Sequence, residues 1–213
     1  DIGGVSAQLS KVRSSQFQDG HSVPLGALAL TEKFVTTDPI EPDEVAAIRQ
    51  HIGWHLDSIP WLSKKQAKPH RRLVGLGGTI RNLAAIAAAR QNHPLNTLHG
   101  FVLTRDSVAT TVQLLQQLPI EERRQISGLS RDRADIIFPG ALVLAEVMDR
   151  LQVDSLTISK NGLREGLFFE QFWHHLDYPV VANVRRFSVL NMARVYNYQK
   201  AHASHVRYLA TRL

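Results

Sequence analysis

A glycine-rich turn between a short apolar strand and a helix is the feature that most constrains this fold. The strand is read at Leu73 and Val74, and glycines follow at positions 75, 77 and 78. A helix is then expected to open at Thr79, a favoured N-cap residue whose hydroxyl can accept a hydrogen bond from a first-turn amide. Apolar residues continue at helical spacing as far as Arg90, at Ile80, Leu83, Ala84 and Ala87.

Such a turn can bind an anion. Glycine has no Cβ, so a phosphate can approach the backbone N–H groups closely. The N-terminus of a helix adds unpaired amides and the positive end of the helix dipole. Without a second feature, the same pattern is explained equally well by a tight strand-to-helix connection in an α/β fold.

A second glycine turn stands at the start of the chain, where Gly3 and Gly4 are followed by Ser6. In an open α/β sheet the strand ends at one edge form a shared crevice in which ligands bind. We therefore expect Gly3, Gly4 and Ser6 to bind one phosphate through backbone amides and a hydroxyl. Another part of the ligand is expected across a groove from it, at Gly77, Gly78 and Thr79.

The rest of the chain predicts an α/β layered domain with a mixed sheet. A β-hairpin is expected within 9–23, with its turn either at 13–15 or at Asp19–Gly20, and it is expected to make the sheet mixed. Asp106 or Ser107 is expected to cap one helix. A helix after Pro42 should bury Val45, Ile48, Ile52 and Leu56. Further expected elements are the helices Ile120–Ile126, Pro139–Leu151 and Leu163–Leu176 and the strand Val153–Ser159.

The composition limits the kinds of metal site and ligand that the chain can have. The chain of 213 residues has no cysteine, which excludes disulfides and thiolate metal sites. No apolar run approaches the about 20 residues needed to span a bilayer, and we expect a cytoplasmic protein with no membrane partner. The net charge is +6, with basic residues scattered rather than interleaved with aromatic ones. That distribution favours a small polyanion over nucleic acid, and no sequence-specific nucleic acid is expected.

The histidine pairs and the tryptophans are expected to have structural roles. The pairs His174–His175 and His202–His205 have spacing compatible with metal binding but no convincing carboxylate partner, so surface or packing roles are expected. The tryptophans, Trp54, Trp61 and Trp173, are expected to be core anchors.

Several motifs in the same order resemble one family, the exopolyphosphatase and guanosine pentaphosphate phosphohydrolases. Asp1-Ile2-Gly3-Gly4-Val5-Ser6-Ala7-Gln8 is similar to the segment that opens that family's second domain. The further matching segments are Ser22-Val23-Pro24-Leu25-Gly26-Ala27, Gly75-Leu76-Gly77-Gly78-Thr79, Arg133-Ala134-Asp135 and Gly162-Leu163-Arg164-Glu165-Gly166.

The resemblance implies the second half of an actin-like (ribonuclease H-like) ATPase fold. Residues 1–178 would form the second actin-like phosphatase domain, and 179–213 a linker and the first helix of a truncated helical third domain. In that helix Val206, Leu209, Ala210 and Leu213 form an apolar stripe. Because the chain begins at Asp1 rather than at Met, it is expected to be a fragment of a longer protein, and a homodimer is possible in the full-length protein.

The resemblance also implies hydrolysis of terminal phosphate from polyphosphate or guanosine pentaphosphate, with Mg²⁺ neutralising charge. The family's catalytic base is a glutamate of the first domain, which this chain lacks. Asp1 is the candidate metal ligand. Gln8 stands where a glutamate is expected and Ala7 where a threonine is expected, so no catalytic residue is assigned within the chain, and an amide cannot replace a carboxylate as metal ligand or base.

Two other functions stay open. A degenerate family member could bind a phosphorylated ligand or a protein partner without hydrolysing it, and Ala7 and Gln8 favour that reading. A sugar- or acetate-kinase-like protein of the same superfamily is disfavoured by the match at Gly162–Gly166. Arg133 and Asp135 are expected to be structural, and an ion pair is as good an explanation of Arg164 and Glu165 as ligand contact.

Overall fold

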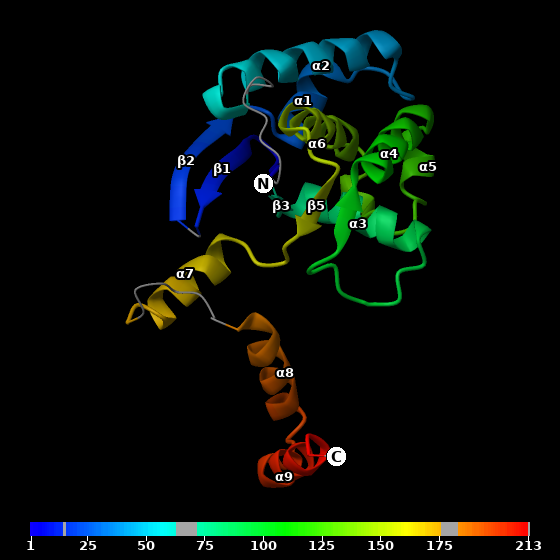
Figure 1. Cartoon of the computed structure of the whole chain (residues 1–213). Coiled ribbons are helices and arrows are strands. Elements are labelled where there is room, and N and C mark those ends of the chain that lie inside the picture. The colour runs from blue at the N-terminus through cyan, green and yellow to red at the C-terminus, as the bar shows by residue number, and fades with distance from the viewer. Residues whose placement is uncertain (15, 63–71, 176–182, 213) are drawn as a thin grey trace. The chain divides into compact units, whose positions relative to one another are not determined.

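Alternating short strands and helices build the larger of two compact units, Asp1–Gly162, and three helices build the smaller, Leu163–Leu213. A computed structural model describes residues 1–14, 16–62, 72–175 and 183–212 (Figure 1). The predicted domain boundary near residue 178 lies outside the described residues. No helix in these described ranges combines the length and apolar character needed to cross a membrane.

The predicted hairpin is present as β1 (Ala7–Arg13) and β2 (Gln16–Val23), paired antiparallel. Its turn lies between Arg13 and Gln16. Asp19 and Gly20 are instead within β2, opposite a register shift between Lys11 and Val12. The hairpin is a two-stranded sheet of its own.

The second sheet has the order β3-β5-β4 and surrounds the predicted strand–turn–helix segment. β3 (Leu73–Gly75) pairs in parallel with β5 (Ser155–Ile158), and β4 (Val102–Thr104) pairs antiparallel with β5. The prediction that the hairpin makes the sheet mixed was therefore wrong, because the antiparallel strand is β4. α3 (Gly78–Arg90) follows β3, and α4 (Arg105–Gln117) follows β4.

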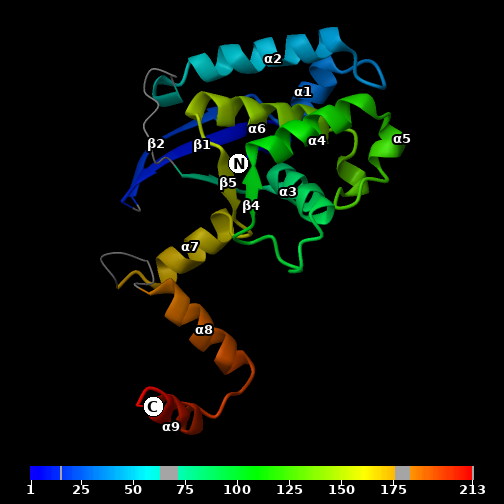
Figure 2. The same ribbon diagram turned by 45° about the vertical axis from the view of Figure 1, so that its right-hand side comes forward.

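α6 (Ile137–Leu151) is the central helix of the larger unit. It begins two residues before the predicted Pro139, because Ile137 and Phe138 are already buried against the core. It packs against α1 (Ala27–Phe34), α2 (Pro42–Asp57), α3 and α4. Figures 1 and 2 show α6 lying between α2 and the three-stranded sheet.

The predicted apolar face of α2 is confirmed, since Val45, Ile48, Ile52 and Leu56 are all buried. Trp54 is not a core anchor: its side chain is 69% exposed. The reason is helical geometry, because a residue two positions after Ile52 points away from the buried stripe. Trp61 packs against the core as expected.

Two N-caps and the end of one helix also differ from prediction. Gly77, not Thr79, is the N-cap of α3, and no side chain caps that end. Thr104, not Asp106 or Ser107, caps α4, because its hydroxyl accepts a hydrogen bond from the Ser107 N–H. α5 (Ile120–Arg123) is shorter than the predicted helix and has Pro119 at its N-cap.

The smaller unit contains α7 (Leu163–Phe172), α8 (Val184–Val195) and α9 (Lys200–Ala210). α7 ends before the predicted Leu176. Among the side chains described in this unit none is buried, and its apolar residues include Phe168, Phe172, Met192 and Leu209 in exposed positions. Phe169 and Trp173 stack with ring centroids 4.7 Å apart.

Arg123 and Asp38 tie α5 to the loop before α2. Arg123 is 2% exposed, and its Nε donates to the Leu115 carbonyl at 2.8 Å. Its Nη2 lies 3.5 Å from Asp38 Oδ1, an ion-pair contact without hydrogen-bond geometry. Burial lowers the pKa of Arg123, and Asp38 opposes that shift. Asp38 also accepts from the Ile120 N–H at 2.9 Å.

Asp38→Asn should lower the free energy of unfolding by about 2 kcal/mol, because it leaves the buried Arg123 without its counter-charge. The measurement is urea unfolding at pH 7. Glu121→Gln, which removes the exposed pair between Arg124 and Glu121, is the control and should stay within about 0.5 kcal/mol of wild type. Equal losses in the two variants would contradict this role for Asp38.

Glu44 closes the N-terminus of α2 in a capping box with Glu41. Its Oε1 accepts from the Thr36 N–H at 2.6 Å and the Thr36 hydroxyl at 2.7 Å. Its Oε2 accepts from the Thr37 hydroxyl at 2.5 Å and the Glu41 N–H at 3.1 Å. Burial raises the pKa of Glu44, but these hydrogen bonds outweigh burial and lower it to about 2.

Glu44→Gln should therefore destabilise the protein at pH 7. A carboxyl whose pKa is depressed in the folded state stabilises that state above its ordinary pKa of 4.5, and the contribution fades as the pH falls toward 2. Urea unfolding of both proteins at a series of pH values should show the difference shrinking below pH 4.5. Asp43→Asn, whose carboxylate accepts no hydrogen bond from the residues described, should not reproduce that convergence; a pH-independent difference for Glu44→Gln would refute the assignment.

Candidate functional site

The turn at Gly77 leaves the first amides of α3 open. Gly77 has φ +91°, a conformation that glycine adopts without strain. The first helical hydrogen bond joins the Arg81 N–H to the Gly77 carbonyl at 3.1 Å. The preceding N–H groups, those of Gly78, Thr79 and Ile80, have no intrahelical acceptor, and no side chain caps them.

The Asp1 carboxylate lies directly over this turn. A Cβ at Gly77 would be 1.9 Å from Asp1 Oδ1, so only glycine leaves room for that carboxylate. The negative group therefore sits at the positive end of α3. Asp1 precedes Gly3 by two residues, so this contact places the start of the first glycine turn beside Gly77. Gly3, Gly4, Gly77 and Gly78 are all half-buried rather than covered.

The first turn is anchored on the N-terminus of α1. The carbonyls of Gly3 and Gly4 accept from the N–H groups of Ala27 and Ala29, at 2.9 and 3.0 Å. The Gly3 N–H donates to the Ser6 carbonyl at 2.9 Å, so this amide is already used. Within the described ranges the N–H groups of Gly4, Val5 and Ser6 donate to no protein acceptor.

Thr79 is buried, with 1% of its surface exposed. A Cβ at Gly140 of α6 would lie 2.4 Å from Thr79 Cγ2 and 3.2 Å from Ala27 Cβ. The Thr79 side chain thus fills the junction of α1, α3 and α6, on which the two turns rest. Only the backbone N–H of Thr79, and not its buried side chain, is open at the turn.

Arg133, for which a structural role was predicted, lies at the same turn. A Cβ at Gly78 would be 3.2 Å from Arg133 Nη2, so the guanidinium packs on the glycine backbone. Asn82 positions this segment: its Nδ2 donates to the Gly78 carbonyl at 2.9 Å, and its Oδ1 accepts from the Ser130 N–H at 2.8 Å. The sequence signal for Arg133 was the Arg133-Ala134-Asp135 segment, whereas Asn82 follows the glycine turn directly, three residues after Thr79.

Gln8 and Ala7 occupy the positions where the resemblance places glutamate and threonine. The Gln8 N–H donates to the Asp1 carbonyl at 2.8 Å, and its carbonyl accepts from the Asp1 ammonium at 2.9 Å. The Gln8 side chain is exposed, and Ala7 is buried. Among the described residues at the turns, Asp1 therefore supplies the carboxylate, and Gln8 has a neutral amide where the resemblance implies a second one.

The segment that leads into Gly162-Leu163-Arg164-Glu165-Gly166 begins beside β3, the strand that precedes the Gly77 turn. The Ser159 N–H donates to the Gly75 carbonyl at 2.8 Å, which places the ends of the parallel strands β3 and β5 together. The Ser159 hydroxyl donates to the Asn161 carbonyl at 2.9 Å. Arg164 and Glu165 belong to the smaller unit. In the part of the chain that is described, no three His, Cys, Asp or Glu side chains gather as a metal site.

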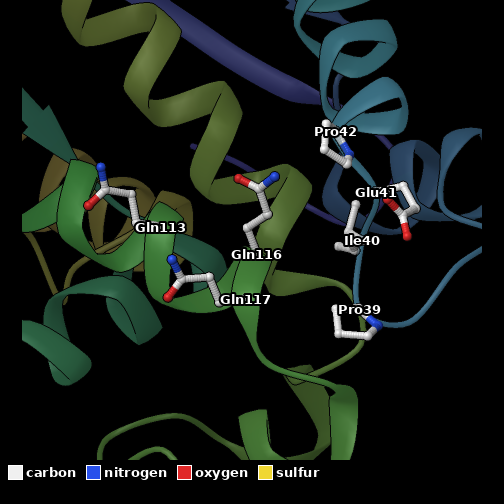
Figure 3. Close-up of a pocket in the computed structure, with 7 residues that line it drawn as sticks. All are labelled: Pro39, Ile40, Glu41, Pro42, Gln113, Gln116 and Gln117. Carbon is white, nitrogen blue, oxygen red and sulfur yellow. The ribbon is translucent and has the colours of Figure 1, made fainter.

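A separate surface hollow of about 360 Å³ lies between the loop before α2 and α4 (Figure 3). Three glutamine side chains of α4 and one glutamate line it together with apolar residues. None of the predicted site residues lines it. The lining residues are Pro39, Ile40, Glu41, Pro42, Gln113, Gln116 and Gln117.

Comparison with known proteins identifies the family of the chain. Residues 1–175 match the profile of the Ppx/GppA phosphatase family. Exopolyphosphatase 1 of Mycobacterium leprae is 28% identical over 171 residues, covering 80% of this chain and 50% of that protein. The chain spans about half the length of the curated relatives it matches.

Solved structures show the same fold. The Aquifex aeolicus Ppx/GppA family member has a TM-score of 0.70 and 29% identity, covering 82% of this chain and 55% of that one. An exopolyphosphatase from Cytophaga hutchinsonii has a TM-score of 0.72 at 20% identity, covering 81% of this chain and 55% of that one. Because the family profile matches residues 1–175 and the solved structures share the fold, this chain belongs to the Ppx/GppA phosphatase family and has its actin-like ATPase fold.

Proposed function

We propose that this chain supplies the phosphate-binding half of a phosphohydrolase that releases terminal phosphate from inorganic polyphosphate, with guanosine pentaphosphate as the alternative substrate. The observation that carries the proposal is the contact between Asp1 and Gly77, which joins two sets of open amides. Relatives of the chain are named exopolyphosphatases, and a polyphosphate presents the repeated anionic oxygens that such amides bind.

The charges around the turns support a polyanionic substrate. The open amides of Gly78 and Thr79 and the guanidinium of Arg133 favour negative charge at one place. The chain as a whole has a net charge of +6. Substrate binding should accordingly weaken with added salt.

The donors at the turns fit a Mg²⁺ ion bound in part by its substrate. Mg²⁺ commonly uses one or two protein carboxylates together with substrate phosphates. Asp1 would hold the ion, and its carboxylate faces the open turn rather than another side chain of the described residues. When bound, Mg²⁺ neutralises charge on the phosphates; the chain's own amides and Arg133 then orient the terminal group for attack by water.

A binding protein that does not hydrolyse its ligand is the second candidate. Gln8 is the specific observation in its favour, because its amide cannot accept a proton from water as a carboxylate can. The resemblance implies that the catalytic base belongs to a domain outside these residues, so both candidates share the same phosphate site. A cytoplasmic location and a homodimer in the full-length protein stay predictions.

Gly77→Ala should weaken binding of a polyphosphate in the presence of Mg²⁺ by about 10-fold or more, because the new Cβ displaces the Asp1 carboxylate. Isothermal titration calorimetry measures it. Gly100→Ala is a matched control: φ is +82° there, but nothing lies within 4 Å of the added Cβ. Both substitutions should cost about 1 kcal/mol of stability, and only Gly77→Ala should affect binding. Equal polyphosphate affinities in the two variants would contradict the proposed site.

Gln8→Glu separates hydrolysis from binding alone. In the longest natural protein that contains this chain, the hydrolase proposal predicts phosphate release from polyphosphate, increased by the added carboxylate. Released phosphate is measured directly. Background release with and without the substitution, together with intact polyphosphate binding, would leave the non-hydrolysing candidate as the function.

A further inference from the structure

Two histidines on α2 lie one helical turn apart, away from the glycine turns. His51 and His55 are at positions i and i+4, so their side chains share a face of the helix. Their ring centroids are 4.6 Å apart, with the ring planes at 81°. The same spacing in zinc-binding helices places two imidazoles on one metal ion.

Aromatic neighbours hold both rings. The Phe34 ring of α1 lies 5.0 Å from the His51 ring, and the Trp54 ring lies 4.6 Å from the His55 ring. Both histidines are half-buried, and across the described ranges their ring nitrogens make no hydrogen bond or ion pair and are not sealed from solvent. The nitrogens are therefore available to a ligand without breaking an existing contact.

The distance between the His51 and His55 ring centroids suits two ligands of one metal ion. An imidazole nitrogen binds a zinc ion at about 2.0–2.1 Å, so two rings at ligand angles of about 90–110° have centroids roughly 4.5–5.2 Å apart. The observed centroid separation of 4.6 Å lies at the short end of this range. We propose that His51 and His55 form a two-histidine site for a late first-row divalent cation such as Zn²⁺, Ni²⁺ or Cu²⁺.

Charge around the pair acts in two directions. Burial, and after it the positive charge of Lys33, lowers the pKa of both histidines, and His55 adds to the shift of His51. The rings are consequently neutral at pH 7, as metal ligation requires. The same Lys33 ammonium, which lies 5.1 Å from the Phe34 ring centroid, repels a dication. Binding should therefore be limited by Lys33, with water completing the coordination.

Trp54 provides a direct readout, because it contacts His55. Cu²⁺ added to the tag-free chain should quench tryptophan fluorescence, and Trp54→Phe should remove most of that quenching. Zn²⁺ binding, measured by calorimetry, should weaken at least 10-fold in His51→Asn and in His55→Asn. The matched control is the double variant His202→Asn, His205→Asn on α9, which removes two exposed histidines and should leave Zn²⁺ binding unchanged.

Lys33→Gln tests the site without removing a ligand. It should tighten Zn²⁺ binding several-fold, because it removes the repelling charge, and circular dichroism should show an unchanged helix content. Zn²⁺ binding that is unaffected by His51→Asn and His55→Asn, or that is lost only in the α9 control, would overturn the proposal. So would a Lys33→Gln variant that folds normally and binds no more tightly than wild type.

Discussion

The placement of the Asp1 carboxylate over Gly77 is the contact on which the site depends. It requires a residue without a side chain at φ +91°, since any Cβ would enter the space of the carboxylate. Two turns that are more than 70 residues apart in the sequence meet there. The junction beneath them is equally tight, because Thr79 fills the space that a side chain at Gly140 would need.

The chemistry of the site follows from what these turns leave unpaired. The helix N-terminus at Gly77 offers amides without acceptors, and the loop after Gly3 offers three more. Arg133, positioned through the hydrogen bonds of Asn82, adds the positive charge. We propose that this site binds and orients anionic oxygens. Among the described residues at the turns, Asp1 supplies the carboxylate, and the proposed hydrolysis would take its base from outside these residues.

The elements with the strongest local sequence patterns were predicted correctly. The strand–turn–helix at Leu73–Arg90, the buried face of α2 and the hairpin each depend on residues close in sequence, and the structure confirms all three. The prediction of Thr79 as the N-cap of α3 was wrong, because the conformation of Gly77 and not the threonine hydroxyl decides where the helix begins. That choice frees Thr79 to pack against α6.

Residues whose role depends on tertiary contacts were not predictable. The contact of the Arg133 guanidinium with Gly78 was not predicted, because only the path of the chain after α5 places it there; its structural role stays a prediction. The hairpin was assigned to the main sheet, whereas strand pairing beyond the hairpin has no local signal in the sequence. Trp54 was misassigned for a different reason: the helical period already placed it opposite the stripe of Val45, Ile48 and Ile52, but its size suggested burial.

Hydrogen–deuterium exchange with and without polyphosphate and Mg²⁺ tests the joint site most directly. The account predicts that amides of both turns, residues 4–6 and 78–80, become protected together and at the same ligand concentration. Protection confined to one turn, or to the basic helices α8 and α9 alone, would contradict it.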